Sequence, residues 1–532
     1  MTPNNRRTYK KGHRRYSRKK ITILALSIAF IAFSGMRCIR QCEGGSGDEK
    51  SDSLSVENLP RLNDSINNTT TQFAQAQKLD SMVNKFLKRW EIKGAQLAVS
   101  RNDSLVYVRG YGWAEQEKQI AMEPSHIMRI ASVSKLLTAV GIMKLQEMGK
   151  VKLSEHVFGP TGVLNDSAYT NIIKDKRHFD ITVEDLLRHR AGFTRAEGDP
   201  MFATRYIMMQ NRLTTPPDHE TLLKIVLKRR LGYQPGSDTH KYSNIGYLLL
   251  SMIIEKRTGL SYEEFMQKHV LNPAGCFGFK IAGNYYKDKY PNEVKYYMHK
   301  DAEPIDEFNN SKRQVVKCYG ENDVTALSGA GAWCASAAEV CHFVSAIDGD
   351  AHYPDIINAH SLDLMTKEGD YHFSLGWNTT PVDGVWSRTG TLSGTSALVL
   401  RYAKEKQCWV FMMNTSTWKG QMFAKDTREF LDELQKKFGA QMKAVVTTGR
   451  CAAGVRLQHL RHTGNGVASC PQLRRVGDGI AYGQRVDLSK VIVDAAVVPS
   501  DTHIPIPNAG VAEMTRSFFQ CVAIRPLIDL DG

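Results

Sequence analysis

Residues 129–140 constrain the fold of this chain more than any other stretch, because a serine and a lysine stand one helical turn apart at the start of an apolar run. Ser132 precedes Lys135 by three residues, which places both side chains on one face of a helix. A serine hydroxyl becomes a good nucleophile when a neighbouring group takes its proton and backbone N–H groups at a helix start bind the developing oxyanion. The pattern alone also fits two ordinary polar residues near a helix N-terminus, so the rest of the sequence must distinguish these interpretations.

The net charge of +15 over 532 residues suggests a nucleic-acid-binding protein until the charges are located. Residues 1–20 contain nine Lys or Arg and no acidic residue, and residues 441–532 contain ten Lys or Arg against seven Asp or Glu. The central body is therefore close to neutral and has no basic stripe of the kind that follows a phosphate backbone. We expect no nucleic-acid partner.

An apolar run at residues 21–36 directly follows the basic residues 1–20. The run is short for a spanning helix and long for the apolar part of a signal peptide, and no convincing cleavage site follows it. We favour an uncleaved signal anchor over a cleaved signal peptide, with the basic block in the cytoplasm. Residues 37–72, rich in Gly, Ser, Asn and Asp, predict a flexible linker. The chain is thus expected in the bacterial inner membrane with its body facing the periplasm, or exported if the signal is cleaved.

The ten cysteines form no Cys-x-x-Cys pair and no Cys/His spacing typical of a zinc site. In an exported protein some of them could form disulfides, for example Cys334 with Cys341. Burial as small apolar side chains is at least as good an interpretation. We expect no metal and no cofactor.

Hydrophobic periodicity predicts an α+β body over residues 73–440, which opens with a helix and an antiparallel hairpin. The predicted elements are a helix at 73–90, strands at 94–100 and 105–109 around an Asn102-Asp103 turn, a small-residue passage at 326–333, a helix at 337–346, an edge strand, turn and strand within 386–400, a strand at 408–414 and an amphipathic helix at 423–438.

Two further passages deliver polar side chains to helix ends. In residues 181–193, Thr182 can cap a short helix that Gly192 ends. His189 in that passage is better explained as a helix-end histidine bonded to local backbone than as a catalytic group. Tyr242 and Asn244 follow a Pro-Gly turn and stand just before a strongly apolar helix, in a loop of the kind that presents active-site groups.

Residues 441–532 form a tail to which the sequence assigns no fold. Its basic residues are mostly Arg, it contains no tryptophan, and its helical periodicity is weak. A His462-Thr463-Gly464 motif falls in this tail without a strand pattern around it, so we interpret it as a chance match.

Three short motifs stand in order along the body: Ser132-Val133-Ser134-Lys135, then Tyr242-Ser243-Asn244, then Arg388-Thr389-Gly390. With these motifs the chain resembles the serine β-lactamase and penicillin-binding-protein-like hydrolases, in the class C-like branch that includes D-alanyl-D-alanine carboxypeptidases and esterases. The resemblance covers about residues 75–440 and extends to the passages 181–193 and 242–275.

The resemblance implies a β-lactamase/transpeptidase-like α+β fold, with an antiparallel sheet flanked by helices, a helical lobe, and the site between them. It also implies that Ser132 attacks a carbonyl to form an acyl-enzyme, while Lys135 and Tyr242 share the work of the general base.

Five more residues are implied in substrate binding. Asn244 would position Lys135 and the substrate amide. The substrate-binding site would also be lined by Arg388, Thr389, Gly390 and Thr391. The family's oxyanion hole corresponds to the backbone N–H groups of Ser132 and Thr391.

Arg388 departs from the family, which usually has Lys or His at this position. Arginine stays protonated and cannot shuttle a proton, but it can hold a carboxylate through two parallel hydrogen bonds. This favours a small-molecule or peptide substrate with a free carboxylate, such as a D-amino-acid-terminated peptide, and argues against efficient β-lactam hydrolysis. The alternative is a charge on a strand edge that faces solvent.

The leading hypothesis is therefore an exported, membrane-tethered serine hydrolase that cleaves an amide or ester bond, of the carboxypeptidase or esterase kind. The alternative is a catalytically weak protein that uses the same site to bind wall peptides or penicillin.

Overall fold

The computed structural model describes residues 61–442 except 72, 194–197, 368–373 and 382–383, together with 461–463 and 467–469. The contacts separate Met1–Leu59 from a second unit, Pro60–Gly532. Within the described residues, no helix has the length and apolar character needed to cross a membrane. The predicted signal anchor at 21–36 lies outside the described residues.

A six-stranded antiparallel sheet forms the centre of the body, in the order β3-β2-β1-β11-β10-β9. Its strands are β1 (Gly94–Arg101), β2 (Ser104–Glu115), β3 (Ile120–Ala121), β9 (Val385–Leu392), β10 (Thr395–Tyr402) and β11 (Gln407–Met413). The β1–β2 turn places Asn102 and Asp103 at positive φ, which suits the two-residue turn that the sequence predicts there. β9 lies at the sheet edge, also as predicted.

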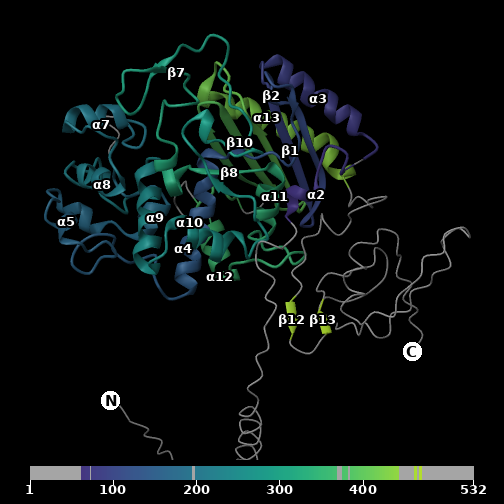
Figure 1. The fold of residues 1–532 in the computed structure, drawn as a ribbon. Coiled ribbons are helices and arrows are strands. Elements are labelled where there is room, and N and C mark those ends of the chain that lie inside the picture. Colours follow the sequence, from purple (N-terminus) through teal and green to yellow (C-terminus); the bar gives the residue numbers. More distant parts are fainter. Residues whose placement is uncertain are drawn as a thin grey trace, which may run out of the picture. The chain divides into compact units, whose positions relative to one another are not determined.

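One face of this sheet packs against two amphipathic helices, α3 (Ala76–Arg89) and α13 (Phe423–Phe438) (Figure 1). Alternation along β11 sends Trp409 and Phe411 into this cluster, where the ring of Phe411 lies near those of Phe86 and Phe430. The 423–438 helix has the bounds predicted from sequence, because its apolar stripe is what the sheet buries.

The opposite face packs against α11 (Ala337–Ser345) and, through it, joins the larger core of the protein. Val410 and Met412, the neighbours of Trp409 and Phe411 on β11, belong to this second cluster. The sheet is therefore a middle layer covered on both faces, which explains why every residue of β10 and β11 is buried.

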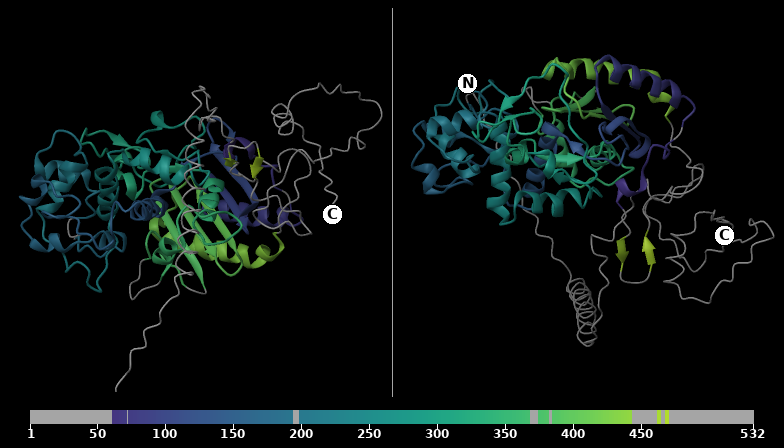
Figure 2. Two further views of the ribbon diagram at one scale, coloured as in Figure 1. Left: turned by 90° about the horizontal axis from the view of Figure 1, so that it is seen from below. Right: turned by 45° about the horizontal axis from the view of Figure 1, so that its top comes forward.

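Helices far from the sheet form a lobe of their own, seen on the left of Figure 1 and again in both views of Figure 2. Its elements and those that join it to the sheet are α4 (Ser134–Glu147), α5 (Ser167–Thr170), α6 (Val183–Leu187), α7 (Thr204–Asn211), α8 (His219–Leu227), α9 (Asn244–Thr258), α10 (Tyr262–Met266) and α12 (Ala359–Thr366). α4 and α9 are buried on almost every side, so they form the centre of this lobe rather than its surface. The predicted α+β class is confirmed.

Three small ladders complete the described structure. β4 (Met128–Arg129), β8 (Trp333–Ala335) and β5 (Lys280–Ile281) form one, β6 (Ile305–Asp306) pairs with β7 (Gln314–Val315), and β12 (Arg461–Thr463) pairs with β13 (Val467–Ser469). The last pair corrects the prediction that no strand surrounds His462-Thr463-Gly464, because His462 and Thr463 lie in β12.

The packed body begins earlier than the sequence suggests. Residues 61–71, assigned to the flexible linker 37–72, include the short helix α2 (Leu62–Ser65). Leu62 and Ile66 are buried in the larger core, and the Asn63 amide donates to Glu339 of α11. Two apolar side chains within a polar segment are enough to dock it, which a composition argument cannot detect.

Cys334 and Cys341 do not form the disulfide that the sequence allowed. Both are free and buried, as are Cys276, Cys318 and Cys408. The alternative interpretation, small buried apolar side chains, is confirmed for these five.

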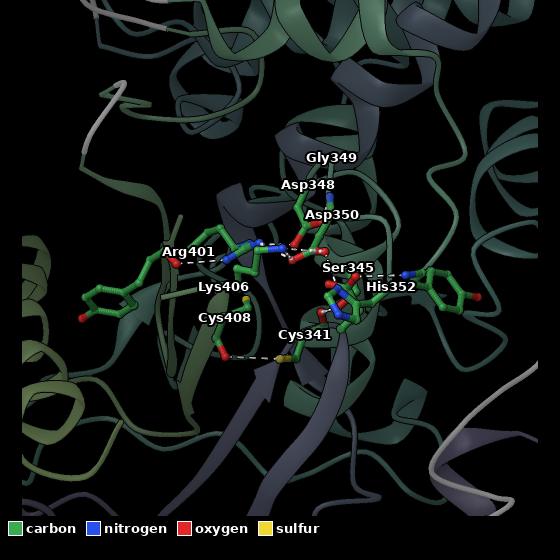
Figure 3. Close-up of polar contacts among 12 residues, drawn as sticks. Cys341, Ser345, Asp348, Gly349, Asp350, His352, Arg401, Lys406 and Cys408 are labelled. Carbon is green, nitrogen blue, oxygen red and sulfur yellow. Dashed lines mark hydrogen bonds and ion pairs between the residues drawn. The ribbon is translucent and has the colours of Figure 1, made fainter. Parts of the chain in front are cut away.

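A charged cluster, called here the Asp350 network, lies at one end of the sheet, and Figure 3 shows four of its members, Asp348, Asp350, Arg401 and Lys406. It consists of Asp103 in the β1–β2 turn, Asp348 and Asp350 after α11, Arg401 on β10 and Lys406 in the β10–β11 turn. Arg401 Nε donates to Asp348 at 2.6 Å, and Lys406 Nζ lies 3.1 Å from Asp350 Oδ2. The side chains of Asp348, Asp350 and Arg401 are almost fully buried, so this cluster is part of the interior of the fold.

Candidate active site

Ser132 lies in a single 3₁₀ turn, η2 (Ala131–Val133), between strand β4 and helix α4. The preceding Ala131 has φ +48°, an unusual conformation for a residue with a Cβ, which marks the sharp turn from strand to helix. Ser132 itself is half-buried, whereas its neighbours in η2 are fully covered. The turn therefore presents the hydroxyl at the surface of the core.

Lys135, one turn further on in α4, is fully buried and points back at the serine. Its Nζ donates to Ser132 Oγ at 3.2 Å, to Asn244 Oδ1 at 2.7 Å and to the carbonyl oxygen of Ala330. Three acceptors satisfy the three donors of an ammonium, which makes burial of this charge tolerable. The Ser132–Lys135 pair predicted from spacing is thus within hydrogen-bonding distance.

Tyr242 stands directly before α9, whose N-terminus is capped by the Ser243 hydroxyl. Lys135 Nζ lies 4.9 Å from the centre of the Tyr242 ring, and Arg388 Nη2 donates to the Tyr242 hydroxyl at 3.2 Å. Tyr242 therefore sits between two cations that come from different elements, α4 and β9.

This arrangement changes the acidity of the tyrosine. Burial raises the pKa of Tyr242, but the charges of Lys135 and Arg388, with hydrogen bonds to Lys135 and Ser132, outweigh it and lower the pKa to about 8. Burial, together with Arg388, lowers the pKa of Lys135, while Tyr242 and Asp199 oppose that change. Both shifts bring the two groups closer to neutral pH, where a group that must accept and return a proton works best.

Asn244 is the first residue of α9 and uses both ends of its amide. Its Oδ1 accepts from Lys135, and its Nδ2 donates to Asp199 Oδ2 at 2.8 Å. Asp199 is a residue that sequence reasoning missed. It precedes α7 by several residues, and nothing in the sequence links it to Asn244, 45 positions later.

β9 contributes the remaining predicted residues, and Gly390 allows the strand to lie close to the backbone of Ser132. A Cβ at Gly390 would clash with the Ile130 carbonyl oxygen and lie 2.9 Å from the backbone N of Ser132. Glycine is needed here because the two backbones approach so closely. Thr389 is held by Asn378, whose Oδ1 accepts from its backbone N at 2.8 Å, and Thr391 is half-buried next to it on the strand.

Arg388 is fully buried, which contradicts the interpretation of a strand-edge charge in solvent. Its Nε donates to the backbone oxygen of Ser132 at 2.8 Å and its Nη2 to Tyr242. Its Nη1 is buried without a hydrogen-bond partner among the residues that the structure describes. At least two of the three guanidinium nitrogens therefore already donate hydrogen bonds to groups of the protein itself.

His189 lies within the 181–193 passage, just after α6, and its ring bonds to a backbone group 54 positions further along the chain. Its Nδ1 accepts from the backbone N of Ser243 at 3.1 Å, and its ring centre lies 4.5 Å from that of Tyr242. Burial and the nearby cations Lys135 and Arg388 lower its pKa well below the usual value. His189 is thus an uncharged ring that packs against Tyr242. The helix itself ends at Leu187, before Gly192.

Elsewhere in the described part of the chain, Asp103, Asp350 and His352 place one possible metal-ligand atom each within 4.8 Å of the others. Asp350 is already ion-paired with Lys406, and its Oδ1 lies 2.5 Å from Nδ1 of His352. We therefore interpret this group as an ion-pair network and derive no metal chemistry from it.

Comparisons with known proteins identify the family and the fold. A family profile described as beta-lactamase matches residues 79–433. PbpX of Bacillus subtilis (strain 168), named as a penicillin-binding protein, is 25% identical over 403 residues, covering 75% of this chain and 90% of PbpX.

Two solved structures share the fold. The octameric penicillin-binding protein homologue from Pyrococcus abyssi has a TM-score of 0.51 at 20% identity, covering 68% of this chain and 77% of the other. D-amino acid amidase from Ochrobactrum anthropi SV3, complexed with L-phenylalanine amide, has a TM-score of 0.54 at 17% identity, covering 70% of this chain and all of the other. Since the family profile spans about two thirds of the sequence, the chain belongs to the beta-lactamase family.

Proposed function

We propose that this protein is a serine hydrolase that forms an acyl-enzyme at Ser132 from an amide or ester substrate. The observation that carries the proposal is the contact of Lys135 Nζ with Ser132 Oγ at 3.2 Å, beside a tyrosine whose pKa is lowered to about 8. A nucleophile, a group able to take its proton and a second group to orient that base are the parts that covalent catalysis requires.

In the proposed reaction, Tyr242 in its ionised form takes the proton of the Ser132 hydroxyl while the serine oxygen bonds to the substrate carbonyl carbon. The carbonyl electron pair moves to oxygen, and the tetrahedral intermediate collapses by expelling the amine or alcohol, which receives the proton from Tyr242. Water then attacks the acyl-enzyme by the same route and releases the acid. Lys135 and Arg388 stabilise the ionised phenol throughout.

The oxyanion would be held by the backbone N–H groups of Ser132 and Thr391. The close approach of β9 to the Ser132 backbone at Gly390 supports this assignment. Two fixed N–H donors need no reorganisation when charge develops, which is why such sites lower the barrier.

The substrate class is an amide or ester, with peptides that end in a D-amino acid as the first candidates. The similarity to penicillin-binding proteins and to a D-amino acid amidase supports this choice. Recognition of a free carboxylate through two parallel hydrogen bonds from Arg388 is less well supported than its sequence suggested, because Nε and Nη2 already donate to Ser132 and Tyr242 and only Nη1 has no partner among the described residues. We assign Arg388 instead to the activation of Tyr242.

We further propose that the basic residues 1–20 and the apolar residues 21–36 place the hydrolase on the periplasmic face of the inner membrane. Fractionation of cells that express the full chain, with protease added to spheroplasts, tests this placement. Resistance of the body to external protease would argue against it.

A covalent probe tests the chemistry. The full chain treated with a serine-reactive fluorophosphonate should gain the mass of one phosphonyl group, and Ser132→Ala should gain none. Thr138→Ser serves as a control because it lies on the same helix and keeps a hydroxyl. A wild-type chain without an adduct would refute the proposal.

A substrate panel separates the finer possibilities. D-Ala-D-Ala peptides, short-chain p-nitrophenyl esters and nitrocefin are compared for the wild type and Ser132→Ala. We expect turnover of at least one peptide or ester and little turnover of nitrocefin. An adduct with the probe or with penicillin, but no turnover of any substrate, would favour the binding protein.

A further inference from the structure

Asp199 lies in the segment before α7, and its contacts lead through Asn244 to Lys135. Its Oδ2 accepts from Asn244 Nδ2 at 2.8 Å, and Asn244 Oδ1 accepts from Lys135 Nζ at 2.7 Å. Asp199 is 8% exposed and Asn244 5%, so neither side chain can readily exchange its partner for water. The three side chains form one chain of hydrogen bonds.

The carboxylate of Asp199 is itself fixed in place. Its Oδ1 accepts from the backbone N of Met201 at 3.1 Å, and its backbone oxygen accepts from the N of Phe202 at 2.9 Å. This closes a local turn that holds the side chain toward α9.

An asparagine amide has nearly the same shape in its two orientations, so hydrogen-bond partners decide which end points where. An ionised carboxylate can only accept, and an ammonium can only donate. With Asp199 on one side and Lys135 on the other, only one orientation of Asn244 satisfies both. The reverse orientation would place its NH₂ against the Lys135 ammonium and its oxygen against the carboxylate.

From this geometry we infer that Asp199 is a positioning residue for the acyl-transfer reaction, which sets the orientation of Asn244 and, through it, the place and charge of Lys135. The inference rests on the proposed function. Asp199 lies outside the three motifs, so the inference adds a residue to the site that the motifs do not contain.

The charges around Lys135 give the inference a measurable sign. Tyr242 before α9, Arg388 on β9, Asp199 before α7 and His189 after α6 all face this ammonium or the groups that contact it. Of these, Arg388 favours proton loss from Lys135, and Asp199 opposes it. Removing the negative charge of Asp199 should make proton loss from the Lys135–Tyr242 pair easier.

The principal test is Asp199→Asn, which keeps the size and the hydrogen-bonding capacity of the side chain but removes its charge. It also allows the Asn244 amide to adopt the reverse orientation. We expect kcat/KM for a p-nitrophenyl ester to fall roughly 10- to 100-fold, with most of the loss in kcat. The rate of labelling by the fluorophosphonate should fall by a similar factor. The pH–rate profile should move to lower pH, and Asp199→Glu should recover part of the rate because the carboxylate returns. Thermal unfolding should change little.

Asp218→Asn is the matched control. Asp218 caps α8 in the same lobe, accepts from the backbone N of Thr221, and asparagine is an equally good cap. It loses the same charge as Asp199→Asn without contacting Asn244, and we expect an unchanged rate and profile.

A double-mutant cycle tests the path of action. If Asp199 acts through Asn244, Asp199→Asn should change the rate by less than about twofold in an Asn244→Ala background. An undiminished effect there, or a wild-type rate and unshifted profile for Asp199→Asn in the native background, would overturn the inference while leaving the acyl-enzyme proposal intact. No labelling of the wild-type chain would overturn both.

Discussion

The proposed active site and the Asp350 network both bury charged side chains, yet they move the pKa of their acidic member in opposite directions. At the active site two cations, Lys135 and Arg388, face the phenol of Tyr242 and lower its pKa to about 8. In the Asp350 network, burial and the carboxylates of Asp348 and Asp350 raise the pKa of Asp103 to about 9. Burial penalises ionisation in both places, so the sign of the neighbouring charges decides the outcome.

The two regions also differ in what burial achieves. In the Asp350 network, Arg401 and Lys406 pair with carboxylates on neighbouring turns and hold those turns together (Figure 3). At the active site, Lys135 and Arg388 donate to groups that are to react or to the backbone that carries them. The first arrangement contributes to structure, and the second keeps a proton acceptor ionisable near neutral pH.

The largest expected effect comes from removing a cation of the active site. Lys135→Met should reduce labelling by the fluorophosphonate about 10³-fold, because Tyr242, the proposed proton acceptor, loses one of its two cations and Ser132 loses its hydrogen bond from Lys135. Circular dichroism should stay that of the wild type. A labelling rate within tenfold of the wild type would mean that Lys135 does not activate Ser132.

Removing a cation from the Asp350 network should affect stability instead. Arg401→Met leaves the buried Asp348 carboxylate without its charged partner and should lower the free energy of unfolding by about 3 kcal/mol. Urea unfolding followed by tryptophan fluorescence measures this, with Lys85→Met, an exposed lysine on α3, as the control. If the chain remains folded, its labelling rate should match the wild type.

A smaller effect is expected when the second active-site cation is neutralised. Arg388 lowers the pKa of Tyr242, so Arg388→Gln should raise that pKa and move the pH–rate profile to higher pH, with a rate loss of roughly tenfold at pH 7. Activity should recover as the pH rises. Arg388→Lys keeps the charge and should shift the profile less; an equal shift in both variants would assign the role of Arg388 to shape rather than charge.

The smallest effect is expected at Asp103. Its folded pKa of about 9 lies above its ordinary 3.8, so the folded state holds a proton that the unfolded state releases, and stability falls as the pH rises between these values. Asp103→Asn should remove that dependence and raise the free energy of unfolding at pH 5 by about 1–2 kcal/mol relative to wild type, with little difference at pH 3.

Urea unfolding at both pH values measures the change. Asp166→Asn, at the N-cap of α5, controls for loss of a carboxylate elsewhere. Parallel pH dependence in the wild type and Asp103→Asn would show that Asp103 ionises normally.

Sequence patterns predicted the local elements well where one apolar face meets one partner. α13 and the β1–β2 turn follow their predicted positions because an amphipathic stripe and a two-residue turn are local properties, whereas β2 extends to Glu115, beyond the predicted end at Arg109. The same reasoning placed residues 61–71 in a linker, since the docking of Leu62 and Ile66 depends on a core built from distant segments.

Within the site, the three motifs identified Ser132, Lys135, Tyr242 and Arg388, and the structure brings these four together. The motifs did not identify Asp199. They also did not determine whether the Arg388 side chain faces solvent, the substrate or other groups of the protein. Both depend on contacts between elements far apart in the chain, Asn244 with Asp199 and Arg388 with Ser132.

By itself the sequence determined the chemical types available to this protein: a hydroxyl and an amine one turn apart, a phenol before an apolar helix, and a guanidinium on an edge strand. Spacing along a helix or strand is set by backbone geometry and can be read without the fold. Only the tertiary structure decided which charges face each other at short distance in the interior. That arrangement fixes the pKa of Tyr242, the orientation of Asn244 and the hydrogen-bond partners of Arg388. Electrostatic interactions depend on distance and burial rather than on position in the chain.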